Sequence, residues 1–87
     1  METPTEFLRK VARVSRLTSG TGLENIEFDM GGDPTVWFIR KHDRCAMFVS
    51  DIEGMEFDDL VDLVKKGMEG SRQRRIRDAK ELKNFKL

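Results

Sequence analysis

Two neighbouring strand-like segments, residues 36–40 and 45–50, are apolar at almost every position, and this feature constrains the fold most strongly. A third segment, residues 25–30, alternates strictly between polar and apolar residues, which is typical of a strand with one solvated face. Turn-forming residues at 31–34 and 41–44 separate the three segments. The pattern predicts a three-stranded antiparallel meander whose second and third strands are apolar on both faces.

A helix is predicted before this sheet. The segment Thr3-Pro4-Thr5-Glu6 has the form of a capping box with proline at the first helical position. At about 100° per residue, apolar and basic residues then gather on opposite sides of the helix. The apolar side holds Phe7, Leu8, Val11 and Val14, and the basic side holds Arg9, Arg13 and Arg16. Gly20 is expected to end the helix in the left-handed conformation.

Two further helices are predicted after the sheet. Residues 56–68 place apolar side chains on one side and acids on the other, and the acids precede the lysines, which suits the helix dipole. Gly67 and Gly70 are expected to interrupt the chain there. Residues 71–86 predict a third helix with seven basic residues against two acidic ones.

The chain of 87 residues has room for one domain. Its 38% apolar residues and balanced charge, with 16 basic and 16 acidic residues, indicate a soluble folded domain. The sequence therefore predicts a single small α+β domain over residues 1–87, in the order helix, three-stranded meander, helix, helix (αβββαα). Residues 71–87 are expected to form a basic C-terminal helix that is loosely attached.

The strand pairing decides which side chains form the core. With two-residue loops at Gly32-Asp33 and His42-Asp43, Phe28 faces Trp37 and Trp37 faces Phe48. One face then holds Ile26, Phe28, Trp37, Ile39, Ala46 and Phe48, which we expect to lie under the helices. The other face carries Val36, Phe38, Cys45, Met47 and Val49, an unusual apolar surface for the outer side of such a sheet.

The sequence leaves two alternatives for what covers that second face. In the first, the third helix folds back over it with Ile76, Leu82 and Phe85. In the second, the face is left for a partner protein or for a second copy of the chain. The glycines before the third helix and its drifting apolar pattern suit the second alternative.

No segment indicates catalysis, a metal or a cofactor. His42 is the only histidine and Cys45 the only cysteine, which is too few for a zinc site, and nothing suggests a cleft for a nucleophile. The glycines do not form a phosphate-binding spacing, and Trp37 is expected in the core. The chain is therefore expected not to be an enzyme and to need no cofactor.

The expected function is protein binding. The predicted surface combines the apolar sheet face with the acidic face of the second helix: Val36, Phe38, Met47, Val49, Asp58, Asp59 and Asp62. The size of the chain also fits a small inhibitor or adaptor of the kind that viruses and mobile elements encode. A lone cysteine, without an N-terminal leader or a long apolar stretch, favours the cytoplasm of a cell or infected host.

The alternative function is nucleic-acid binding through the basic first helix and the arginine-rich last helix. The candidate residues are Arg9, Arg13, Arg16, Arg72, Arg74, Arg75 and Arg77. Against it, the four arginines between 72 and 77 point in all directions around a helix, and the net charge of zero gives no long-range attraction to a polyanion.

Overall fold

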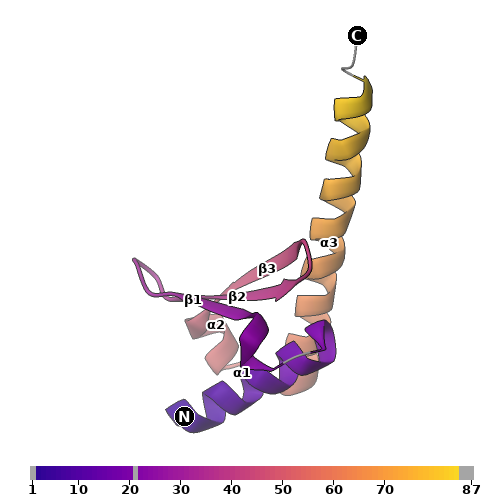
Figure 1. Cartoon of the computed structure of the whole chain (residues 1–87). Helices are drawn as coiled ribbons and strands as arrows, with labels where there is room; N and C mark the ends of the chain where they lie inside the picture. The colour runs from indigo at the N-terminus through magenta and orange to yellow at the C-terminus, as the bar shows by residue number, and fades with distance from the viewer. Residues whose placement is uncertain (1, 21, 85–87) are drawn as a thin grey trace.

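The computed structural model describes residues 2–20 and 22–84 (Figure 1). Its elements follow in the order α1 (Pro4–Ser19), the short 3-10 helix η1 (Leu23–Asn25), β1 (Ile26–Asp29), β2 (Thr35–Arg40), β3 (Asp43–Phe48), α2 (Val49–Glu53) and α3 (Phe57–Asn84). The strands form one antiparallel sheet in the order β1-β2-β3. This arrangement confirms the predicted α+β fold with a helix, three strands and two helices.

The ends of α1 are those predicted. Thr3 caps the helix, because the backbone N–H of Glu6 donates to Thr3 Oγ1 at 3.2 Å. Gly20 closes the helix with a φ of 84°, which is a conformation that glycine adopts without strain. Val11 and Val14 are fully buried on the apolar side.

The predicted strand register is wrong. In the structure Phe28 lies opposite Val36, and Phe48 lies opposite Thr35. The β1–β2 loop, residues 30–34, is longer than the two-residue turn assumed from the sequence, and a slip of one residue turns each side chain of one strand toward the other face. The second turn is Lys41-His42, with Lys41 at a φ of 56°, because Asp43 already pairs with Arg40.

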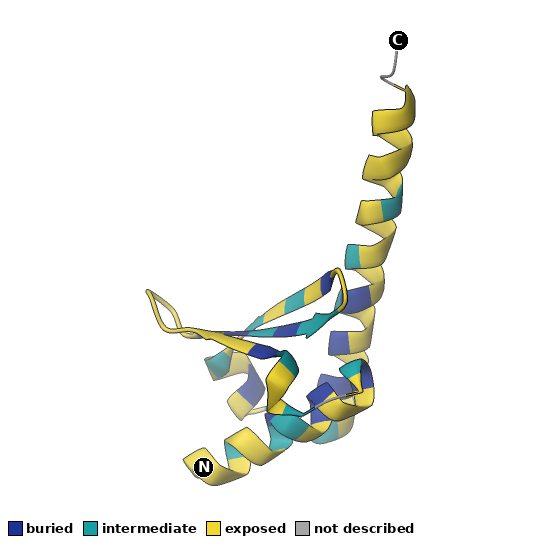
Figure 2. Cartoon of the chain, in the orientation of Figure 1, coloured by how far each residue is buried: buried dark blue, intermediate teal, exposed yellow. Residues whose placement is uncertain are grey.

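The two faces of β2 and β3 are therefore exchanged relative to the prediction. Val36 and Phe38 are fully buried beneath α1 and α3 together with Ile26 (Figure 2). Trp37 lies on the opposite face and is half-buried, and Phe48 on that face is 50% exposed. No helix in the described part of the chain covers this outer face in Figure 1.

The long helix α3 runs unbroken through Gly67 and Gly70, so the predicted interruption between residues 68 and 71 is wrong. Gly67 lies where α3 crosses β3. A Cβ atom at Gly67 would lie 3.0 Å from Cys45 Cβ and would overlap Cys45 Sγ. The glycine therefore permits the close approach of helix and sheet, whereas Gly70 faces open space.

A polar clamp, formed by Asp43, Ser71 and Arg75, holds α3 to the β2–β3 turn. Asp43 is only 4% exposed, and its Oδ1 atom lies 3.4 Å from both Ser71 Oγ and Arg75 Nε. The backbone N–H of Arg44 donates to Ser71 Oγ at 3.2 Å. The clamp is the last described point at which α3 is bonded to the sheet.

Beyond the clamp, α3 projects away from the body of the molecule (Figures 1 and 2). Leu82 is 70% exposed, so this segment does not fold back over the sheet as one alternative supposed. Phe85 and the predicted helix end at Lys86 lie outside the described residues.

We predict that Gly67→Ala leaves the protein less stable than Gly70→Ala by about 1–3 kcal/mol, because only the first methyl group collides with Cys45. Both changes gain helix propensity equally, so Gly70→Ala is the matched control. The free energy of unfolding is measured by urea titration. Cys45→Ala in the Gly67→Ala background should recover part of the loss, and equal stability of the two glycine variants would contradict the close approach.

Candidate functional site

The apolar residues predicted to bind a partner belong mostly to the core. Val36 and Phe38 are fully buried, and half-buried Met47 packs against the same cluster. Their assignment as a docking surface is wrong, because the slipped register turns these positions toward the helices.

Val49, the fourth of these residues, lies in a different setting. It lines a cavity of about 330 Å³ between the start of α1, the end of β1 and α2. We call this cavity the docking groove. Its lining consists of Glu2, Thr3, Pro4, Phe7, Leu8, Phe28, Met30, Val49 and Glu53.

The walls of the docking groove expose large apolar side chains from separate parts of the chain. Leu8 of α1 is 41% exposed, Phe28 of β1 is 44% exposed and Met30 is 67% exposed. Single exposed apolar side chains are ordinary, but several gathered around one hollow mark an interaction site. The sequence placed Phe28 in the core and gave no signal that Leu8 would meet Met30.

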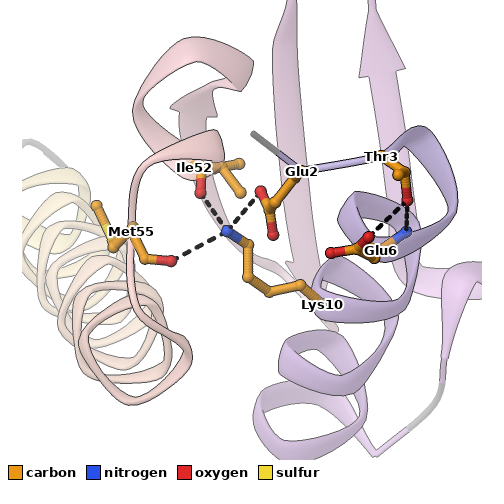
Figure 3. A network of polar contacts seen from close by, with 6 residues as sticks. All are labelled: Glu2, Thr3, Glu6, Lys10, Ile52 and Met55. Atoms are coloured by element: carbon orange, nitrogen blue, oxygen red, sulfur yellow. Dashed lines mark hydrogen bonds and ion pairs between the residues drawn. The ribbon is translucent and has the colours of Figure 1, made fainter.

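The charged residues in the groove lining are both acids, Glu2 and Glu53. Glu2 is paired with Lys10, whose Nζ lies 2.9 Å from Glu2 Oε1 (Figure 3). Glu53 is the last residue of α2 and also lines the groove. The groove therefore combines an apolar interior with a rim whose negative charge comes from Glu53, because Lys10 offsets the charge of Glu2.

Lys10 holds the two helices that form this groove. Its ammonium group donates to the backbone carbonyl oxygen of Ile52 in α2, to that of Met55 just after α2, and to Glu2 (Figure 3). All three donors of the ammonium group thus have partners, and the side chain is largely buried. Lys10 fixes the position of α2 relative to α1.

The predicted acidic residues lie elsewhere. Asp58, Asp59 and Asp62 are exposed, and on α3 they point away from the buried side that carries Leu60 and Val64. The structure therefore does not bring them together with the apolar residues of the predicted surface.

The basic side of α1 is exposed, as predicted, but it is surrounded by acids. Arg9 and Arg13 line a hollow that also contains four glutamates. The Arg13 guanidinium lies 4.2 Å from the centre of the Phe57 ring, a cation–π contact that joins α1 to the start of α3. These arginines are part of a mixed surface. The glutamates of the hollow are Glu2, Glu6, Glu53 and Glu56.

The basic residues of the last helix are separated from those of α1. Arg72, Arg74, Arg75 and Arg77 are all exposed. Arg72 pairs with Glu69 at 3.7 Å, and Arg75 is bonded to Asp43. The clamp also places the basic β2–β3 turn beside this part of α3, a neighbourhood that the sequence did not suggest.

The outer face of the sheet forms a second apolar surface. It carries Trp37, Ile39, Ala46 and Phe48. A shallow hollow of about 300 Å³ lies beside Phe48 and contains Asp51. Among the described elements, this surface involves only the strands of the sheet and α2.

The two residues that invited a catalytic interpretation do not form a site. His42 is exposed in the β2–β3 turn, and Cys45 packs against Gly67, where burial raises the pKa of its thiol and keeps it protonated. Within residues 2–20 and 22–84, no three His, Cys, Asp or Glu side chains gather as a metal site would require. The helices described there include none with the length and apolar character needed to cross a membrane.

Comparison with known proteins found no matching family model, no matching curated protein and no matching solved structure. The functional argument therefore rests on the surfaces described above.

We predict that Lys10→Met lowers the free energy of unfolding by about 1–3 kcal/mol, because the carbonyl oxygens of Ile52 and Met55 lose a charged donor. Methionine keeps most of the apolar stem, so packing is little changed. Lys66→Met, at an exposed position, is the control and should change stability by less than about 0.5 kcal/mol. Equal effects of the two changes in urea titrations would show that Lys10 does not bind α2.

Proposed function

We propose that the protein is a small non-enzymatic interaction module that binds another protein through the docking groove. The observation that carries this proposal is the gathering of Leu8, Phe28 and Met30 around one cavity. These side chains come from segments far apart in the sequence, and burying the exposed part of each in a complex contributes a fraction of the roughly 1.5–3 kcal/mol gained by burying a fully exposed apolar side chain.

The chemistry of the groove specifies its partner. An apolar interior favours a segment that presents aliphatic or aromatic side chains, and a rim with carboxylates favours basic residues beside them. Met30 adds an unbranched side chain that adapts to different shapes. The fitting partner is an amphipathic protein segment with an apolar face flanked by lysine or arginine, of the kind that binds as a helix in a groove.

Further acids lie near the groove. Glu6 and Glu56 lie in the adjoining mixed hollow with Arg9 and Arg13, and Asp51 belongs to the same short helix as Glu53. This end of the molecule thus attracts a basic partner before contact, which accelerates association. Such a module suits an inhibitor or adaptor in the cytoplasm of a cell or infected host.

The groove is tested with two designed helical peptides, one of leucine and lysine and one of leucine and glutamate, labelled for fluorescence anisotropy. We expect the leucine–lysine peptide to bind, and Leu8→Ser with Met30→Ser to weaken its binding by at least about tenfold. The leucine–glutamate peptide should bind at least about tenfold more weakly, because the rim repels it.

The matched control replaces two exposed leucines outside the groove, Leu17→Ser with Leu23→Ser, and should leave peptide binding unchanged. An equal loss in both double variants, or equal affinity for the two peptides, would contradict the proposal. Self-association that disappears in the Leu8→Ser, Met30→Ser variant would identify a second copy of the chain as the occupant and contradict the basic-segment partner. Circular dichroism confirms that both variants are folded.

A further inference from the structure

The last part of α3, from the clamp outward, is a second candidate surface, at the other end of the molecule from the docking groove (Figure 1). We call residues 72–84, which include the clamp residue Arg75, the basic arm. It holds six basic residues against two acidic ones, and all of these residues are exposed. The basic residues are Arg72, Arg74, Arg75, Arg77, Lys80 and Lys83.

The structure shows which basic residues of the arm are bonded to the sheet and which share one side of the helix. Arg75 is engaged by the buried carboxylate of Asp43. On a continuous α-helix with about 100° per residue, four of the remaining basic residues fall within an arc of roughly 140°. These residues are Arg72, Arg77, Lys80 and Lys83. Asp78 and Glu81 lie outside this arc, so the charged residues on this side of residues 72–84 are all basic, and Arg72 at its base pairs with Glu69 at 3.7 Å.

The β2–β3 turn adds further cations at the base of the arm. Lys41 lies in this turn, Arg40 and Arg44 flank it in β2 and β3, and the clamp holds it against Ser71. The one acid of the turn, Asp43, is buried and paired with Arg75, so the turn presents a positive surface to solvent.

The net charge of zero conceals this separation. Acids predominate around α2 and the start of α3, and cations predominate on the arm and the turn. The long axis of the molecule spans 56 Å, several times the Debye length of about 8–10 Å at physiological salt. The acidic end therefore does not screen the arm from an anionic partner.

We propose that the basic arm and the β2–β3 turn bind the phosphate backbone of a nucleic acid. Beyond Arg75 the arm is a single helix that projects from the body, with about the diameter that the major groove of a duplex admits. Its lysines and arginines supply the cations that pair with phosphates and release counterions. This site shares no residue with the docking groove, so it stands independently of the proposed protein partner.

The apolar residues of the arm argue against two other kinds of partner, a membrane surface and a groove on another protein. Ile76, Ala79 and Leu82 recur every third position and together span about 120° of the helix, and one of the three is an alanine, so the apolar face that they form is small. A helix that lies on a membrane needs a continuous apolar face, and a helix that docks in a protein groove needs apolar anchors on one side. Binding by charge to a polyphosphate requires neither.

The test measures binding of short fluorescein-labelled DNA and RNA, each as duplex and single strand, by anisotropy at about 50 and 200 mM salt. We expect saturable binding that weakens steeply with salt. Arg77→Gln with Lys80→Gln should weaken binding at low salt by about tenfold or more and reduce the slope of log affinity against log salt by about two.

The matched control removes two exposed cations from α1, Arg9→Gln with Arg16→Gln, and should change affinity by less than about twofold. Neither pair contributes to the buried core, and circular dichroism verifies the folds. Three results would overturn the proposal: no nucleic-acid binding at low salt, an equal loss in both variants, or tighter binding to polyglutamate or anionic vesicles than to any nucleic acid. Each leaves the peptide assay of the docking groove unaffected.

Discussion

The packing of two helices on one face of a three-stranded sheet is the constraint on which the rest of the structure depends. Val36 and Phe38 of β2 fill the space between sheet and helices, and Gly67 lets α3 approach β3 closely enough to close it. In the described part of the chain, helices cover only this one face of the sheet (Figure 1). The residues around that face, and those beyond its ends, are therefore the ones left for partners, which is why the surfaces described here lie at its margins.

The clamp at Asp43 gives the molecule two ends of opposite charge. By fixing α3 at Ser71 and Arg75, it determines that the following turns of the helix leave the body instead of returning over the sheet. The acids near α2 and the cations of the arm are kept apart, and each end acquires its own field. A protein partner at the groove and a nucleic acid at the arm would give the module the properties of a small adaptor.

The element order, the α1 caps and the meander were predictable because they depend on local patterns: the capping box at Thr3, the left-handed Gly20 and the alternation of residues 25–30. The inner and outer faces of the sheet were not predictable, since both sides of β2 are apolar and the length of loop 30–34 decides which side of β2 faces the helices. Gly67 indicated a helix break by propensity, whereas its role is a tertiary contact with Cys45 that no local pattern reveals. The docking groove escaped prediction for the same reason, because Leu8 and Met30 come to line one cavity only in the folded chain.

The assignment of the two sheet faces is tested most directly by comparing Phe38→Ala with Trp37→Ala in urea unfolding followed by far-ultraviolet circular dichroism. Removing a fully buried phenylalanine side chain costs about 3–5 kcal/mol, which is comparable with the whole stability of many small domains. Trp37 is half-buried on the outer face, so its loss should cost less than half as much. A larger loss of stability for Trp37→Ala than for Phe38→Ala would show that the helices cover the opposite face of the sheet.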